Sequence, residues 1–183
     1  MFEPAIVVSS IGVLVASIGG GLALYNARKA TLWKRAELAN GQVRELYANE
    51  ELLFACRCLD WNAGRLVVPR SLRPLLADGT ETIDHDQTAF RKSLRVDLTT
   101  EEAAEDMRLQ IYRTALDTLL TWMAATDSAI ERRLYKAEDI EDAGYYLGQA
   151  CRIDEVLRFI DAFGYRKSIG RLARKYAVEL PSL

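Results

Sequence analysis

An uncharged, apolar stretch runs from Ala5 to Tyr25, near the start of this 183-residue chain. As an α-helix, its roughly 21 residues extend about 32 Å, which is enough to cross a bilayer core of about 30 Å. The sequence therefore predicts a transmembrane helix within residues 1–25, with the remaining residues forming a separate region outside the bilayer.

The charges on the two sides of this stretch differ. Only Met-Phe-Glu-Pro precedes it, whereas several basic residues follow it closely: Arg28, Lys29, Lys34 and Arg35. Basic residues favour the cytoplasmic side of a membrane, so we expect the N-terminus outside and the following domain in the cytoplasm. A cleaved export signal has its basic residues before the apolar stretch, so we predict a retained anchor whose basic flank contacts lipid headgroups.

Small residues recur every fourth position within the stretch, at Gly12, Ala16 and Gly20. Such a face lets two membrane helices approach closely, which predicts packing against another membrane protein or against a second copy. The alternative is that glycine is simply frequent in membrane helices. Both interpretations remain open at the level of sequence.

The rest of the chain, about 158 residues, is long enough for one domain with its own core. Residues 26–64 lack proline and predict one or two helices, with Gly41 as the expected break. Residues 65–98 contain Pro69 and Pro74 and predict an irregular connection with a short helix near its end. Residues 99–183 predict the helical bundle core.

Helical patterns dominate the last of these segments. Thr99 and Glu102 form the signature of a capping box, after which apolar residues recur at helical spacing as far as Leu134. A second helical pattern runs from Ile140 to Ile160 and ends near Gly164. Since we find no stretch with the alternation expected of a strand, the predicted fold class is all-α: one transmembrane helix followed by a cytosolic helical bundle.

Candidate catalytic or metal-binding residues are few. The single histidine, His85, lies between Asp84 and Asp86, a segment that predicts an exposed acidic loop more readily than a metal site. The acidic residues from Glu138 to Asp142 favour the start of a helix. Cys56 and Cys58 lie about 200° apart on a helix, which favours packing over a shared metal. We therefore expect no catalytic residue, metal or cofactor.

The C-terminal segment from residue 166 is strongly basic and amphipathic. Its apolar residues recur at spacings of three and four, and its basic residues occupy other positions: Arg166, Lys167, Arg171, Arg174 and Lys175. Such a helix can dock its apolar stripe on the bundle, contact anionic headgroups or bind a protein partner. Nucleic acid is not expected, because the whole chain has a net charge of −2.

The order of features after Ile111 includes Tyr135-Lys136-Ala137-Glu138-Asp139, Gly144-Tyr145-Tyr146-Leu147 and Gly164-Tyr165. This order resembles a group of uncharacterised bacterial single-pass membrane proteins with a helical cytosolic domain. The resemblance covers the anchor and roughly the last 75 residues. It implies a location in a bacterial inner membrane and transfers no catalytic residue.

These features lead to two functional hypotheses. The first is a membrane-tethered, non-enzymatic interaction module, either an accessory subunit of an inner-membrane complex or a homo-oligomer, with membrane lipid and another membrane protein or itself as partners. The second is a membrane-anchored regulatory, sensor or defence component, for which we expect a small-molecule pocket near Trp61, Trp122 and Tyr146. An enzyme would need His85 to lie beside the carboxylates of residues 138–142.

Overall fold

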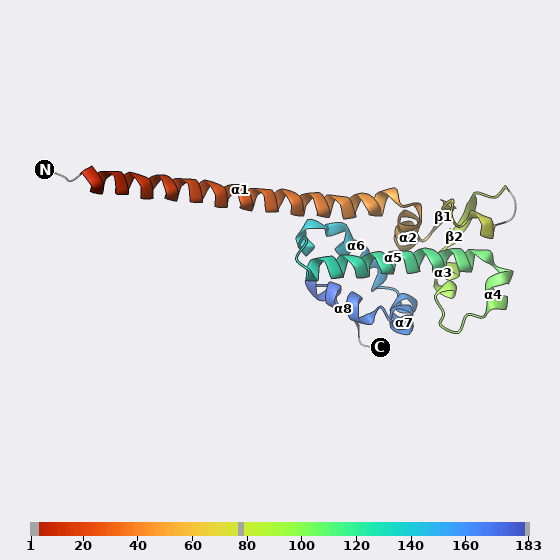
Figure 1. The fold of residues 1–183 in the computed structure, drawn as a ribbon. Helices are drawn as coiled ribbons and strands as arrows, with labels where there is room; N and C mark the ends of the chain where they lie inside the picture. Colours follow the sequence, from red (N-terminus) through yellow and green to blue (C-terminus); the bar gives the residue numbers. More distant parts are fainter. Residues whose placement is uncertain (1–3, 77–78, 182–183) are drawn as a thin grey trace. The chain divides into compact units, whose positions relative to one another are not determined.

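The computed structural model describes the backbone of residues 4–76 and 79–181, and the side chains of residues 20–76 and 79–181. The chain divides into two compact units, residues 1–38 and residues 39–183. The first unit is the N-terminal part of helix α1 (Pro4–Ala48), and the second contains the end of α1 and all the later elements (Figure 1).

Helix α1 continues through Gly41, where the sequence predicted a break. The helix ends at Ala48, and the Asn49 side chain accepts hydrogen bonds from the backbone N–H groups of Glu51 and Leu52 to begin α2 (Glu50–Asp60). An asparagine that satisfies the free N–H groups of a new helix sets the boundary more strongly than one exposed glycine, which costs a helix only about 1 kcal/mol.

The first unit exposes many apolar side chains from α1, including those of Leu22, Tyr25 and Trp33. Within the residues whose side chains are described, no helix is long and apolar enough to cross a membrane. Residues 5–19 of the predicted span, with Gly12 and Ala16, lie outside that part of the chain. Gly20 lies inside it, and a Cβ atom added there would meet no atom within 4 Å.

A two-stranded sheet forms within the segment that the sequence predicted to be irregular. Strands β1 (Ala63–Val67) and β2 (Thr82–Asp86) pair antiparallel, with Ala63 opposite Asp86 and Leu66 opposite Ile83. The prediction that the chain has no sheet was therefore wrong. These strands are short and polar, so their alternation becomes visible only when His85 is counted with Ile83 as an interior residue.

Three further elements complete this region. A short 3₁₀ helix, η1 (Arg73–Leu75), lies between the strands, and α3 (Gln87–Ser93) follows β2 as the predicted short helix. Thr99 and Glu102 form the predicted capping box of α4 (Thr100–Glu105). The predicted single helix is divided at Asp106, whose carboxylate accepts the backbone N–H of Arg108 and begins α5 (Met107–Glu131).

Helix α5 lies at the centre of the second unit, with α2, α3, α4 and α8 (Arg166–Lys175) packed against it (Figure 1). Its apolar residues are buried on two adjoining stripes, as its broad apolar surface predicted: Ile111, Ala115, Leu119 and Trp122 on one, and Tyr112, Leu116, Leu120 and Met123 on the other. The helical bundle around a central helix is therefore confirmed.

The remaining elements are η2 (Ala137–Asp139), α6 (Glu141–Ala150) and α7 (Asp154–Ala162). A single helix from Ile140 to Ile160 was predicted, but extended backbone at Ile153 separates α6 from α7. Gly164 then adopts a φ of 81°, the left-handed conformation that favours glycine at the end of a helix.

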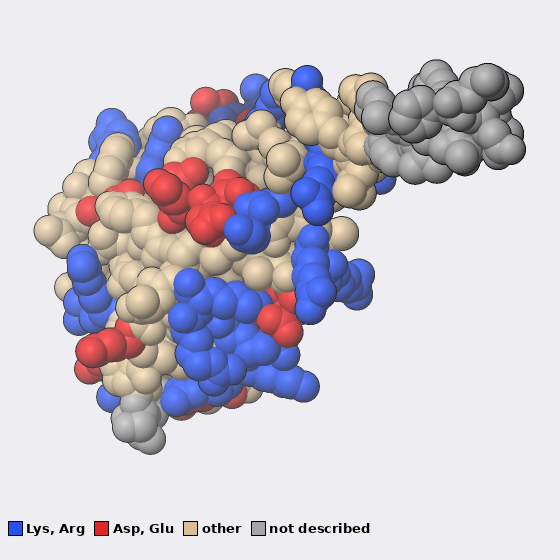
Figure 2. Space-filling view, turned by 90° about the vertical axis from the view of Figure 1, so that its left-hand side faces the viewer, with Lys and Arg blue, Asp and Glu red and all other residues tan. Residues whose placement is uncertain are grey.

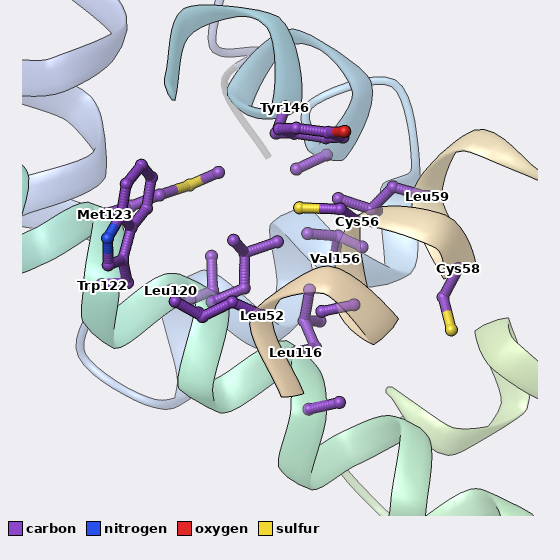
Figure 3. Packing of buried hydrophobic residues seen from close by; sticks show 14 of the residues in the cluster. Leu52, Cys56, Cys58, Leu59, Leu116, Leu120, Trp122, Met123, Tyr146 and Val156 are labelled. Atoms are coloured by element: carbon purple, nitrogen blue, oxygen red, sulfur yellow. The ribbon is translucent and has the colours of Figure 1, made fainter. Parts of the chain in front are cut away.

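The core joins buried residues from both strands and from helices α1, α2, α3, α5, α6, α7 and α8. Figure 3 shows Leu52 and Cys56 from α2 beside Leu120 and Met123 from α5, with Tyr146 from α6 and Val156 from α7 nearby. The sulfurs of Cys56 and Cys58 point to different sides of α2 in this view. Burial, helped by the nearby charge of Asp60, raises the pKa of Cys56 to about 12, so this thiol is protonated at neutral pH and packs as a small apolar group.

Candidate functional site

The basic residues of α8 form a groove on the surface of the second unit. We define the α8 groove by its lining residues, which enclose about 550 Å³: Arg166, Lys167, Gly170, Arg171, Ala173, Arg174, Val178 and Leu180. Figure 2 shows Lys and Arg side chains gathered on one face of the molecule. The groove combines cations with two half-buried aliphatic side chains, Val178 and Leu180.

The position of α8 follows from its amphipathic sequence. Ile169, Leu172 and Ala173 are buried against the core, which confirms that the apolar stripe docks on the bundle. Headgroup or partner contact by α8 stays a prediction, and in the folded domain it would involve the basic residues, because these apolar side chains are removed from solvent. The cations on the other positions remain available for interactions.

Two of the predicted surface cations instead hold α8 to α5. Arg171 donates from Nε and Nη2 to Oδ2 of Asp127, at 2.9 and 2.6 Å, and Lys175 donates to Oδ1 of Asp127 at 2.8 Å. The Asp127 side chain is fully buried, whereas those of Arg171 and Lys175 are 31% and 22% exposed. Contact of Lys175 with a membrane surface or a partner stays a prediction, and within the domain its ammonium group pairs with Asp127 and Glu131.

The ion pairs in this network are reflected in the pKa values. The hydrogen bond to Asp127 raises the pKa of Arg171. Burial lowers the pKa of Lys175, but its hydrogen bonds to Asp127 and Glu131 outweigh that effect, and the net shift is upward. The hydrogen bond from Lys175 lowers the pKa of Glu131. All three shifts favour the charged forms, which is the condition for a stable ion-pair network.

The remaining cations of the groove are less constrained. Arg166 donates to both carboxylate oxygens of Asp161, at 2.9 and 3.0 Å. Lys167 and Arg174 are exposed, and neither makes a hydrogen bond or ion pair with any residue that the structure describes. The first turn of α8 has no acidic residue, and Tyr165 provides no side-chain cap. Positive charge therefore accumulates where the helix dipole is already positive.

Asp127 and the aliphatic side of the groove were missed by sequence reasoning. Asp127 lies four residues after Met123 and seven after Leu120, so it falls on a buried stripe of α5 and needs a partner. That signal was available in the sequence. No signal in the sequence indicated that Val178 and Leu180 line the groove. Their position depends on the backbone at Ala177, which follows α8 and has a φ of 53°.

The other predicted basic residues lie on α1, in the first unit. Arg28, Lys29 and Lys34 are exposed, and Arg35 is half-buried and takes part in an interaction. They accompany exposed apolar side chains, among which Trp33 is 70% exposed and Leu32 is 62% exposed. This part of α1 therefore presents apolar and basic side chains together.

His85 is buried, which corrects the prediction of an exposed acidic loop around it. Its Nε2 lies 2.9 Å from the backbone oxygen of Trp61, and its Nδ1 lies 3.1 Å from the hydroxyl of Tyr112. A carbonyl oxygen only accepts, so Nε2 carries the hydrogen, and in the neutral ring Nδ1 accepts from Tyr112. Both ring nitrogens are satisfied within the fold.

The residues that an enzyme would need are not gathered. His85 contacts Tyr112 near the start of α5. Ile140, within the acidic segment, accepts a hydrogen bond from the Tyr176 hydroxyl. Tyr176 follows Lys175, which pairs with Glu131 at the other end of α5. Figure 1 accordingly shows β2 and the start of α6 beside different parts of α5. Among the described residues, no group of three His, Cys, Asp or Glu side chains could hold a metal ion.

The aromatic residues expected around a small-molecule pocket are also separated in environment. Trp122 and Tyr146 belong to the packed core and are 4% and 9% exposed, whereas Trp61 is 44% exposed at the end of α2.

Comparison with known proteins adds no further constraint: no family model, no curated protein and no solved structure matches this chain.

Proposed function

We propose that this chain is a membrane-tethered, non-enzymatic interaction module, with its N-terminus outside and its helical domain on the cytoplasmic side of a bacterial inner membrane. The observation that carries the proposal is the surface of α1 over residues 20–38. Large apolar side chains are exposed there, with Tyr25 63% and Trp33 70% exposed, and no acidic residue occurs until Glu37.

A helix segment with this composition is suited to a bilayer interface. Tyr and Trp side chains favour the headgroup level because their rings are apolar and their polar atoms reach water. Arg28, Lys29 and Lys34 add the positive charge that anionic headgroups attract. Contiguous exposed apolar surface on a protein usually marks a site of interaction with a membrane or partner. The uncharged stretch before it, residues 5–25, supplies the proposed anchor.

The domain after residue 38 then serves as the binding part of an accessory subunit or a homo-oligomer. Its surface offers a cationic groove. The regulatory or defence alternative stays a prediction, because it needs a bound small molecule.

Membrane attachment is tested first, by expressing the full chain and treating the isolated membranes with alkaline carbonate. We expect the protein to remain in the membrane pellet, because a spanning helix is not released by high pH. Release into the supernatant would refute the anchor.

The interaction is tested by purifying the full chain in mild detergent from its native membrane and identifying co-purifying proteins by mass spectrometry. We expect a stoichiometric partner that is lost in Gly12→Leu/Gly20→Leu, since leucine prevents close helix approach. The matched control is Gly12→Ala/Gly20→Ala, which keeps the side chains small. A protein that emerges alone and monomeric would refute the accessory-subunit and homo-oligomer proposals and favour the regulatory alternative.

A further inference from the structure

We infer that the α8 groove binds the phosphate of an anionic membrane lipid and gives the helical domain its own lipid contact, separate from the α1 anchor. This inference rests on the proposed membrane location. It sharpens the headgroup contact expected from sequence, because the apolar face of α8 is buried in the domain and the groove side carries the available cations.

The cations of the groove occupy consecutive turns of one helix. Lys167, Arg171 and Arg174 are separated by four and three residues, so they lie along one side of α8. Arg171 is bound to Asp127 through Nε and Nη2, which leaves its Nη1 available. Lys167 and Arg174 have no partner among the described residues, so their charge is not neutralised within the domain.

The balance of charge in the groove favours an anionic occupant. Of the four cations that line the groove, Arg166 is paired with Asp161 and Arg171 with Asp127, and no acidic residue lines the groove itself. Two net positive charges therefore remain. A phosphate diester can accept hydrogen bonds from a guanidinium and an ammonium at once, and Arg174 and Lys167 offer these two groups.

The aliphatic part of the groove favours a lipid over a small soluble anion. Val178 and Leu180 are half-buried and lie beside the cations, so a headgroup phosphate can be held while the glycerol and first methylene groups contact these side chains. A free phosphate would use only the cations, and in an open groove it would stay largely hydrated. An acidic peptide would gain little from the aliphatic side chains.

Binding is measured by isothermal titration calorimetry, with the full chain in micelles of an uncharged detergent and short-chain phosphatidylglycerol as the probe. We expect the wild-type chain to bind it, and Lys167→Gln/Arg174→Gln to bind about 30-fold more weakly, since each basic residue near an anionic surface contributes about a factor of five. Arg171 is left intact because its loss would remove one of the two partners of the buried Asp127 carboxylate and so disturb the fold.

The matched control is Arg91→Gln/Lys92→Gln, which removes the same charge from exposed positions on α3. We expect this variant to bind like wild type. Short-chain phosphatidylcholine, inorganic phosphate and an oligoglutamate peptide are titrated in parallel, and we expect each to bind more weakly than phosphatidylglycerol. A Leu180→Ser variant is expected to weaken phosphatidylglycerol binding and leave phosphate binding unchanged.

Several outcomes would overturn the inference. Equal loss in the α3 control would mean that only net charge matters, and equal affinity in wild type and Lys167→Gln/Arg174→Gln would exclude the groove. Tighter binding of phosphate or of oligoglutamate would reassign it to a soluble anion or an acidic protein. Because the titration is made in micelles, it is independent of carbonate extraction, so failure of the anchor and failure of the groove are distinguishable.

Discussion

The buried polar groups at the two ends of α5 have different kinds of partner. Near the start of the helix, Tyr112 and His85 form a hydrogen-bonded pair whose rings pack with Phe54 and Phe90. Near its end, the fully buried carboxylate of Asp127 is paired with Arg171 and Lys175 from α8. The first arrangement needs only matched hydrogen bonds, whereas the second also needs charge balance.

This difference decides what each end can contribute to function. Both ring nitrogens of His85 have hydrogen-bond partners within the fold, so neither is available to a ligand. The charged contact fixes α8 by two of its cations, and the same helix then presents Lys167 and Arg174 without partners in the described structure. A helix held by ion pairs at Arg171 and Lys175 can thus still display positive charge at Lys167 and Arg174, which is the arrangement in the α8 groove.

The largest expected effect concerns the charged end. Arg171→Met/Lys175→Met keeps much of the apolar stems but leaves Asp127 buried without a partner, so we expect a loss of about 3–5 kcal/mol in the free energy of unfolding. Asp127→Asn removes the buried charge and leaves two cations that can reach water, so its cost should be smaller, about 1–2 kcal/mol. Urea unfolding of the full chain in uncharged detergent, followed by circular dichroism, measures both. A greater loss in Asp127→Asn would contradict the asymmetry.

A substitution at the start of α5, where Tyr112 meets His85, should change the free energy of unfolding less. Tyr112→Phe keeps the ring contacts, including the stacking with Phe54, but leaves Nδ1 of His85 without its partner. We expect a loss of about 1–3 kcal/mol in the same urea titration, the usual cost of an unsatisfied buried group. The control is Tyr145→Phe, whose hydroxyl bonds to Asp60 on the surface and whose removal should cost less than about 0.5 kcal/mol.

Close packing near the charged end provides a third test. A Cβ atom at Gly144 would come within 2.5 Å of the Tyr176 ring, whereas one at Gly148 would meet nothing within 4 Å. Gly144→Ala should therefore destabilise the fold by about 1–3 kcal/mol through overpacking. Gly148→Ala on the same helix should stabilise it by up to about 1 kcal/mol, because alanine favours the helix. Similar changes in the free energy of unfolding for the two variants would contradict overpacking, because they would show that the Tyr176 ring moves aside at little cost.

The smallest effect is a dependence on pH at the charged end. The pKa of Glu131 is lowered by Lys175, so its contribution to stability is present above the ordinary carboxyl pKa of about 4.3 and is lost as pH falls through the lowered value. We expect wild type to lose slightly more stability than Glu131→Gln when the pH is lowered from about 6 through this range. Glu101→Gln, an exposed control on α4, should keep the wild-type profile.

Much of the helical structure was predictable because its determinants are local. The capping box at Thr99 and Glu102, the buried stripes of α5 and the glycine that ends α7 each depend on residues within a few turns. The break at Asn49 was also encoded locally, by a side chain that caps α2, although Gly41 was the more conspicuous residue. The resemblance to bacterial membrane proteins stays a prediction.

The candidate site was predictable only in part. The basic composition of residues 166–175 was evident, and docking of the apolar stripe on the bundle was one of the alternatives that the sequence left open. Which cations remain available was not, because this depends on Asp127, 44 residues before Arg171, and on Asp161, five residues before Arg166. Sequence spacing does not tell which opposite charges meet across two helices.

By itself, the sequence determined the long apolar N-terminal stretch, the basic residues that follow it, and the helices whose caps and stripes lie within a few turns. The tertiary structure decided the β1–β2 pairing, the burial of His85 and the use of Arg171 and Lys175 as partners of Asp127. The physical reason is that helix formation depends on neighbouring residues, whereas strand pairing and charge pairing join residues distant in the chain, whose meeting is set by packing of the whole domain.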